Sequence, residues 1–277
     1  MPKNRPTKEF ASFLAEKGFV IVNETSVRSA SETDFSLAEM IFKNKDILIP
    51  FLIEEALAIR GKARSVLHSF SKKTTLVRFF TQLKEEGLLL DWTRIKGKGY
   101  QIEFPPQEEK LRFFRFEWAE RCFQYIILNV VRTFCEKERP GLSFRAFQNV
   151  ELKRKDETEL FTELDLVIQI AKRFYIFEIK SGPWIRIMQW AKREEAFVEK
   201  NGPVRQIVCT IHENIPADIF EPQILMNLGN IEQRFRKMLD ADFSNANLNA
   251  LQNPKPTRLI RAGAAKPSPA AKQPPSP

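Results

Sequence analysis

The sequence predicts an α/β protein with a mixed central sheet flanked by helices and preceded by a small α+β domain. Three observations support this class. Residues 161–170 and 173–180 are apolar runs separated by two residues, which is typical of an antiparallel hairpin. Apolar residues recur at helical spacing on both sides of this hairpin, in residues 113–135 and 183–200. Ahead of them, residues 36–104 combine helical patterns with a second hairpin that has glycine in its turn.

The composition indicates a globular protein. With 277 residues, 43% of them hydrophobic, the chain is long enough to bury a sizeable core. The longest apolar stretch, ILIPFLIEEALAI, is interrupted by Pro50, Glu54 and Glu55, and is shorter than the roughly 20 apolar residues of a membrane span. The first residues, MPKNRPTKEF, contain no apolar signal region, so we expect a cytoplasmic protein without a membrane partner.

The few cysteines and histidines exclude several kinds of site. Cys122, Cys135 and Cys209 are far apart in the sequence and form no CxxC pair, so neither a disulfide framework nor a zinc ribbon is expected. His68 and His212 are the only histidines. They leave little material for a histidine-rich metal site or a Ser-His-Asp hydrolase.

More than half of the net charge of +9 lies at the C-terminus. Residues 254–277 contain five basic residues, no acid and seven of the 17 prolines, so this tail supplies +5 and the rest of the chain +4. Such a composition, without apolar periodicity, predicts disorder. The tail either adds nonspecific attraction to phosphate or is a solvated end.

These patterns divide the chain into four segments. We expect a helix and a short strand, then a winged-helix-like domain, then a larger α/β domain, and last the disordered basic tail. Their residues are 1–35, 36–105, 106–252 and 253–277, respectively.

The second segment resembles a winged helix because helical patterns precede a hairpin. The helical patterns cover residues 36–59, 63–70 and 74–87, and the hairpin covers 88–95 and 100–104. Basic side chains of the third helix and of the hairpin turn could contact phosphates. The candidates are Lys72, Lys73, Arg78, Lys96 and Lys98. The alternative is a solvated basic face on a packing or dimerisation module, which would be compatible with a homodimer.

The third segment has an ordered series of elements. A long helix, residues 113–135, carries Glu117 and Glu120 one turn apart. A strand near residues 147–154 leads to the hairpin of 161–170 and 173–180. The helix of residues 183–200 and a strand near 204–211 follow.

Carboxylates stand in the middle of this apolar hairpin. If Ala171 and Lys172 form a two-residue turn, Asp165 lies directly opposite Glu178. Side chains directly across a ladder start about 4.5–5.5 Å apart, so the two carboxylates repel unless something positive lies between them. A divalent cation would compensate them. Lys180 projects from the same face as Glu178, because side chains alternate along a strand.

The residues Asp165 in ELDLV and Glu178-Ile179-Lys180 in FEIKSG, with Glu120 in WAE, resemble the PD-(D/E)xK, or restriction-endonuclease-like, nuclease superfamily. The three motifs are most similar to the nuclease half of CRISPR-accessory effectors that join a cyclic-oligoadenylate-sensing domain to a nuclease. The residues ahead of the motifs show no Gly-rich Rossmann-like segment, so the resemblance does not extend to the sensing domain.

The resemblance implies a restriction-endonuclease-like core that cuts nucleic acid with Mg²⁺ or Mn²⁺. Asp165, Glu178 and the Ile179 carbonyl would hold the metal, and Glu120 would support the site. Lys180 would orient the attacking water or offset charge on the phosphate.

We therefore expect a metal-dependent endonuclease, with DNA favoured over RNA. Side chains on the helix after the motif are further candidates for contacts to the nucleic-acid backbone, or else they are solvated. They are Arg186, Gln189 and Lys192. The alternative function is a noncatalytic DNA-binding or adaptor protein that keeps a nuclease fold.

Overall fold

The computed structural model describes residues 8–26, 32–61, 65–68, 73–181, 203–212 and 224–244. Residues 1–241 form one compact unit, and residues 242–277 form a second one. The predicted boundary near residue 105 stays a prediction, and the predicted tail of residues 253–277 lies outside the described residues.

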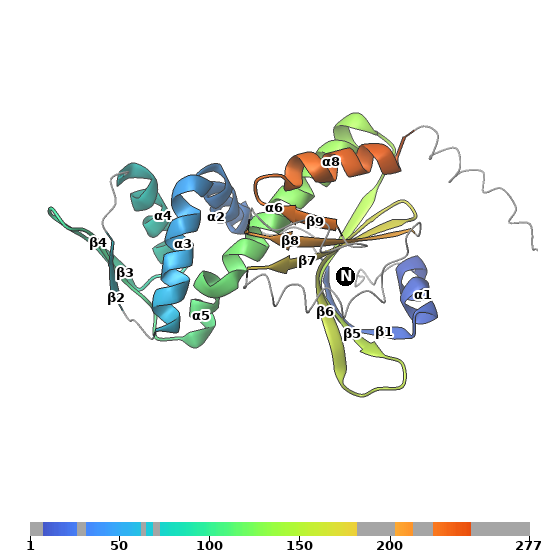
Figure 1. The fold of residues 1–277 in the computed structure, drawn as a ribbon, viewed down its shortest axis with the longest axis horizontal. Helices are drawn as coiled ribbons and strands as arrows, with labels where there is room; N and C mark the ends of the chain where they lie inside the picture. Colours follow the sequence, from blue (N-terminus) through green and yellow to red (C-terminus); the bar gives the residue numbers. More distant parts are fainter. Residues whose placement is uncertain are drawn as a thin grey trace, which may run out of the picture. The chain divides into compact units, whose positions relative to one another are not determined.

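A six-stranded mixed sheet is the centre of the fold (Figure 1). Its strand order is β1-β5-β6-β7-β8-β9. The four strands from β1 to β7 pair antiparallel, whereas β7, β8 and β9 pair parallel. The strands are β1 (Phe19–Ser26), β5 (Phe144–Arg154), β6 (Leu160–Ile170), β7 (Arg173–Lys180), β8 (Val204–Thr210) and β9 (Ile224–Asn227).

The predicted strands of this sheet are confirmed with small shifts of their ends. Strand β7 has the predicted bounds, and β5, β6 and β8 differ from them by one to three residues. The N-terminal segment contains the expected helix, α1 (Lys8–Glu16), and its strand β1 forms the edge of the sheet beside β5. The predicted helix of residues 183–200 lies outside the described residues.

Both faces of the hairpin β6–β7 are buried. Phe174 packs against Phe10 and Phe13 of α1. Tyr175 and Phe177 pack against Phe235 of α8 (Ile231–Asp242). Because consecutive side chains of a strand point to opposite faces, α1 and α8 cover opposite faces of β7. Each fully buried aromatic ring contributes about 1.5–3 kcal/mol to folding. A charged side chain in the same buried strand would be costly unless it has a partner of opposite charge.

The long predicted helix is a continuous helical run that includes two π-helical turns. It consists of α5 (Glu108–Arg112), the π-helical turn η1 (Phe113–Glu117), α6 (Trp118–Thr133) and a second π-helical turn, η2 (Phe134–Glu138). A π-helical turn changes which side chains share a face, and such turns often lie at functional sites. The first of them leads directly into the part of α6 that carries Glu120.

The part of the chain that the sequence predicts to be winged-helix-like contains three helices and a three-stranded antiparallel sheet of order β2-β4-β3. Its elements are α2 (Glu32–Lys43), α3 (Lys45–Arg60), β2 (Ser65–His68), α4 (Lys73–Glu85), β3 (Asp91–Ile95) and β4 (Gly99–Glu103). The predicted helix of residues 63–70 is wrong, because all four residues of β2 pair with β4. Pairing with a distant strand overrides the weak helical pattern of so short a segment.

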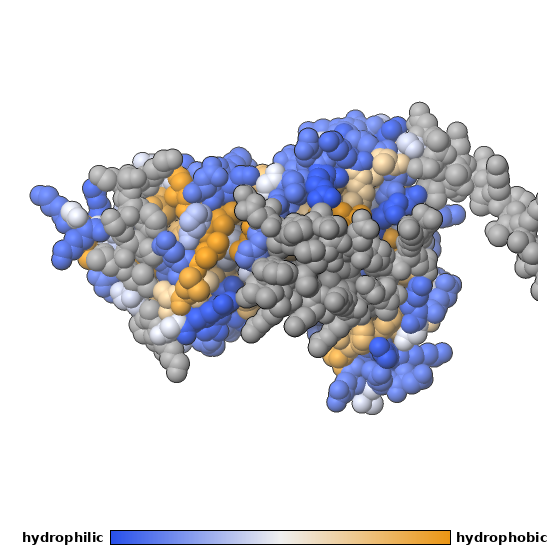
Figure 2. Space-filling model, in the orientation of Figure 1, coloured by the Kyte–Doolittle hydropathy of each residue, from blue (hydrophilic) through white to orange (hydrophobic). Residues whose placement is uncertain are grey.

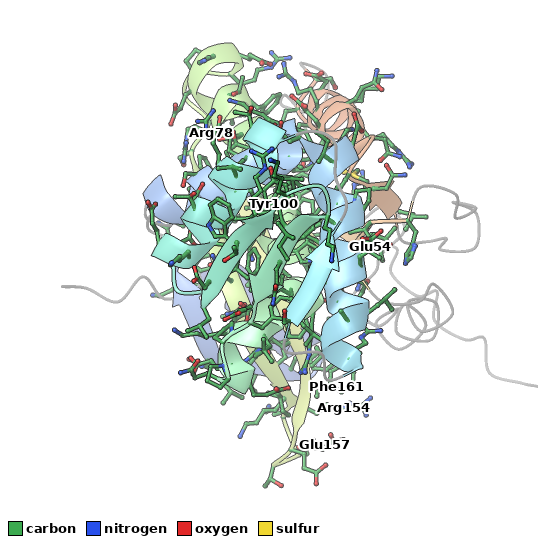
Figure 3. The ribbon with its side chains drawn as sticks, turned by 90° about the vertical axis from the view of Figure 1, so that its left-hand side faces the viewer. Glu54, Arg78, Tyr100, Arg154, Glu157 and Phe161 are labelled. Atoms are coloured by element: carbon green, nitrogen blue, oxygen red, sulfur yellow. The ribbon has the colours of Figure 1, made fainter. Side chains whose placement is uncertain are left out.

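The predicted turn of the second hairpin is confirmed. Gly97 and Gly99 have φ angles of 76° and 121°, which residues with a side chain rarely adopt. Behind the turn, the buried ring of Tyr100, labelled in Figure 3, packs against Phe80 and Trp92. An apolar stripe remains exposed along α3 (Figure 2), where Ile53 and Leu57 are 40% and 61% exposed.

Within the described ranges, every helix is too short or too polar to cross a membrane.

Candidate functional site

The site lies where strands β6 and β7 separate. Their pairs run from Ile170↔Arg173 to Leu166↔Phe177, in the predicted register. The ladder ends one pair before Asp165 and Glu178, although both strands continue. Beyond this point, Oδ2 of Asp165 accepts a hydrogen bond of 2.6 Å from the backbone N–H of Ile179. The carboxylate of Asp165 therefore takes the place of a strand-to-strand contact at the fork.

Glu178 and Lys180 form the other side of the fork. The Glu178 side chain is 1% exposed and forms an ion pair with Lys180, whose Nζ donates to Oε1 of Glu178. Nζ of Lys180 also lies 3.8 Å from Oδ2 of Asp165. On the other side of β7, Glu178 pairs with Val208 and Lys180 pairs with Thr210 of β8. The parallel pairing therefore holds the last residues of β7 in place.

Glu120 faces the same place from helix α6. It lines a cleft of about 530 Å³ together with Asp165, Glu178 and Lys180. The structure thus brings together the four predicted catalytic side chains, which come from α6, β6 and β7. The other residues that line the cleft are Arg112, Phe116, Glu117, Arg121, Gln124, Gln148, Asn149, Thr162 and Glu163.

Burial, and after it the neighbouring charges, shift the pKa values of the side chains in the site. Burial raises the pKa of Glu120 from 4.5 to about 8, and the nearby charges of Asp165 and Glu117 add to the rise. Burial also raises the pKa of Asp165, although Lys180 and the Ile179 N–H oppose this shift. Burial lowers the pKa of Lys180, but the carboxylates of Asp165, Glu178 and Glu120 outweigh it and hold that pKa above its usual value. In the metal-free protein the site therefore favours protonated carboxyl groups, whereas a bound cation would favour their ionised forms.

The raised pKa of Glu120 makes the stability of the metal-free protein depend on pH. Native Glu120 binds its proton more tightly than unfolded Glu120, so this group stabilises the fold at low pH, and its contribution is lost as pH rises from about 4.5 to about 8. We expect the melting temperature of Glu120→Gln to fall less than that of the parent as pH rises over this range. Thermal unfolding in chelator at several pH values measures this dependence. Glu85 is exposed, so Glu85→Gln is the control; an unchanged pH profile in Glu120→Gln would contradict the raised pKa.

The donor chemistry of the site suits a hard divalent cation held by few protein ligands. Asp165 and Glu178 supply carboxylate oxygens from neighbouring strands, and Mg²⁺ is commonly bound by one or two carboxylates plus phosphate and water. In the described part of the chain, no group of three or more His, Cys, Asp or Glu side chains is arranged to hold a metal ion. Asp165 and Glu178 by themselves fit a cation whose other ligands are phosphate and water oxygens.

The predicted nucleic-acid contacts lie apart from this cleft or outside the described residues. Lys73 is the first residue of α4. Arg78 is exposed on that helix and lines a second pocket with α2 residues, and Lys96 and Lys98 are exposed in the β3–β4 turn. Outside the described residues are Lys72, Arg186, Gln189 and Lys192.

Sequence reasoning missed the neutral side chains of the cleft. Phe116, Gln124, Gln148 and Asn149 line it beside the charged residues. One signal was present in the sequence: Gln124 lies four residues after Glu120 and therefore on the same side of the helix. The position of Asn149 depends on an irregularity in β5 that no sequence pattern indicates.

No protein-family model matches the chain. Among curated proteins, the phenylalanine–tRNA ligase beta subunit of Chlamydia caviae is 21% identical over 242 residues, which cover 79% of this chain. The chain spans only 29% of the length of that protein. This match shows no family.

Two solved structures share the fold. Protein VC1899 from Vibrio cholerae superposes with a TM-score of 0.54 and 16% identity over 84% of this chain. Can2 from Sulfobacillus thermosulfidooxidans, solved in complex with cyclic tetra-adenylate, superposes with a TM-score of 0.51 and 12% identity over 82% of this chain. The chain spans 60% of the length of each. These likenesses confirm the predicted fold class, a mixed α/β sheet flanked by helices.

Proposed function

We propose that the protein is a metal-dependent nuclease that hydrolyses phosphodiester bonds at the cleft between β6, β7 and α6. One observation carries this proposal: Asp165, Glu178, Lys180 and Glu120, which belong to three different elements, line one cleft. Burying acids beside a lysine costs free energy. Such groups therefore gather at sites where a ligand or a reaction requires them. The sequence resemblance to PD-(D/E)xK nucleases rests on the same four residues.

The chain's residues have separate tasks in this mechanism. Asp165 and Glu178, with the Ile179 carbonyl, would hold Mg²⁺ or Mn²⁺, which when bound would polarise the phosphate and lower the pKa of a water molecule. Lys180, already placed against both carboxylates, would orient the attacking water or offset negative charge on the phosphate. Glu120, whose raised pKa keeps it mostly protonated at neutral pH without metal, would lose its proton when the cation binds and so add a third carboxylate to the site.

The fold comparison is consistent with this proposal. The sequence resembles the nuclease half of effectors that sense cyclic oligoadenylates, and Can2, which shares the fold, was solved with cyclic tetra-adenylate bound. Nucleic acid is then the proposed partner, with DNA favoured. A role in defence or in mobile elements would fit the same resemblance.

A substrate survey tests the proposal. Purified protein is incubated with labelled single-stranded and double-stranded DNA and RNA, in Mg²⁺, in Mn²⁺ and in chelator. We expect cleavage of at least one substrate that requires the metal. Binding of nucleic acid without cleavage under all these conditions would instead indicate a noncatalytic DNA-binding or adaptor protein.

The basic residues of the winged-helix-like part give a second testable expectation. If Lys72, Lys73, Lys96 and Lys98 contact phosphates, replacing all four by alanine should make the salt dependence of DNA binding shallower, by about 0.9 in log–log slope per lost contact. Binding titrations over a range of salt concentrations measure the slope.

Four exposed lysines elsewhere provide a control with the same change of charge: Lys137, Lys155, Lys172 and Lys237. An equal change of slope in both quadruple variants would mean that net charge, and not this surface, determines binding.

A further inference from the structure

A π-helical turn brings an aromatic ring to the cleft. The turn η1 contains Phe116, which is half-buried and lines the cleft, whereas its neighbours Phe113 and Phe114 are fully buried in the core. The guanidinium of Arg112 lies 5.4 Å from the centre of the Phe116 ring. An aromatic ring that is partly open to a polar cleft can stack on a flat partner, and every nucleobase has such a face.

An irregularity in strand β5 brings amide groups to the same cleft. Asn149 has a φ angle of 50°, which is rare for a residue with a side chain and is tolerated best by Asn and Asp. At this position β5 has one more residue than β1, because Asn23↔Glu151 is followed by Thr25↔Gln148. This is a β-bulge, and bulges next to active sites redirect side chains. Gln148 and Asn149 consequently both line the cleft, although they are consecutive.

The bulge places Asn149 next to the catalytic aspartate. The pairs Gln148↔Leu166 and Val150↔Leu164 enclose it, so Asn149 lies across from Asp165 on the neighbouring strand. Its side chain is exposed, and within the described residues it makes no hydrogen bond. A strained backbone that carries an exposed amide beside catalytic residues indicates a ligand contact.

Two further amides complete the group. Nε2 of Gln148 donates a hydrogen bond of 2.5 Å to Oε1 of Gln124, which fixes both side chains across the cleft. This bond leaves an N–H of Gln124 and the carbonyl oxygen of Gln148 to act as donor and acceptor. Paired amide donors and acceptors match the edges of nucleobases, adenine in particular.

The cationic residues of the cleft are already engaged with carboxylates. Nε of Arg112 lies 3.4 Å from Glu117, and a terminal nitrogen of Arg121 lies 3.4 Å from Glu86. The rest of the cleft lining combines the carboxylates of Glu117 and Glu163 with neutral side chains, namely one ring and several hydrogen-bonding groups. Such a lining suits a base better than a second phosphate.

We propose that Phe116, Gln124, Gln148 and Asn149 form a subsite for one unpaired nucleobase next to the scissile phosphate. The subsite deepens the proposed nuclease function and rests on it for the position of the phosphate. The ring of Phe116 takes the face of the base, and the amides take its edge. In a duplex the face of each base is stacked on its neighbours, so the subsite selects single-stranded or locally opened nucleic acid.

Binding in an inactive background tests the subsite without requiring cleavage. The protein is Asp165→Asn, and the probes are labelled single-stranded DNA of mixed sequence and the same strand with abasic positions. We expect Phe116→Ala to weaken binding of the first probe about tenfold, the effect of losing one stacked base, and to leave the abasic probe unaffected. Phe116→Tyr, which keeps the ring, should bind like the parent.

Phe161→Ala is the matched control. Phe161 also has an arginine against its ring, at 4.9 Å from Arg154, but it lies outside the cleft lining, near the end of the β5–β6 hairpin (Figure 3). This variant should bind both probes like the parent. Equal weakening in Phe116→Ala and Phe161→Ala would overturn the subsite, because the effect would then reflect a general loss of packing.

Asn149→Gly tests the amides. Glycine accepts the positive φ angle without strain, so this variant keeps the bulge and should melt no lower than the parent. We expect it to lose several-fold in affinity for the base-containing probe and, with Asp165 intact, to reduce any base preference at the cut position.

The two proposals fail separately. Base-dependent binding that Phe116→Ala removes, in a protein that does not cleave, supports the subsite and ends the nuclease proposal. Metal-dependent cleavage together with unchanged binding in Phe116→Ala and Asn149→Gly keeps the nuclease and overturns the subsite.

Discussion

We expect Asp165→Asn to abolish metal-dependent cleavage while the protein stays folded, and we expect the same of Glu178→Gln. Each change removes a negative oxygen ligand but keeps the shape of the side chain. Losing even an outer partner of a metal ligand typically costs about 10- to 100-fold in activity, so loss of a direct ligand should cost more. Single-turnover cleavage of a labelled substrate in Mg²⁺ measures the rate.

Thermal unfolding of the same variants gives an independent readout. Burial raises the pKa of Asp165, so its ionised form is costly in the metal-free native state at neutral pH. Asp165→Asn should therefore melt at the parent temperature or above it in chelator, because an asparagine oxygen can still accept the Ile179 N–H. Cleavage at the parent rate in either variant would move catalysis to other residues.

Lys180→Ala has the second-largest expected effect, and it should separate chemistry from metal binding. Lys180 contacts both carboxylates but carries the wrong charge to bind a cation. Its loss should remove a contact made in the transition state, which typically costs about 3 kcal/mol, or on the order of a hundredfold in rate. Calorimetry should show Mg²⁺ binding that is largely intact.

Lys172→Ala is the control for the lysine variant. Lys172 is exposed in the turn of the same hairpin, so its removal changes the net charge equally without changing the cleft. Loss of metal affinity in Lys180→Ala, as in Asp165→Asn, would show that the lysine only holds the site together. Cleavage at the parent rate would show that the Glu178-Ile179-Lys180 motif is a coincidence of strand composition.

The hairpin could be predicted because its information is local. Two apolar runs around a two-residue turn specify strands β6 and β7, and a one-residue slip would move Asp165 to the opposite face. The register is therefore confirmed over all five pairs of the ladder. The same local pattern placed Asp165, Glu178 and Lys180 together, and only the helix that carries Glu120 had to be added by the fold.

What could not be predicted depends on contacts between distant segments. The predicted helix of residues 63–70 is strand β2 in the structure, because its four residues acquire their conformation by pairing with β4. Strand β1 lies beside β5, far from it in the sequence, and the bulge at Asn149 arises along that edge. The π-helical turn that carries Phe116 has no sequence signal either. The neutral side of the cleft was missed for these reasons.

The dependence of cleavage on metal and on Asp165, measured in one experiment, tests the central claim most directly. Parent protein and Asp165→Asn are stripped of metal with a chelator and given labelled DNA, and Mg²⁺ is then added in excess. The proposed site requires that the parent cut only after Mg²⁺ is added and that Asp165→Asn cut at neither stage. Cleavage by the parent in chelator, or equal cleavage by the two proteins in Mg²⁺, would contradict a metal-dependent nuclease site at Asp165 and Glu178.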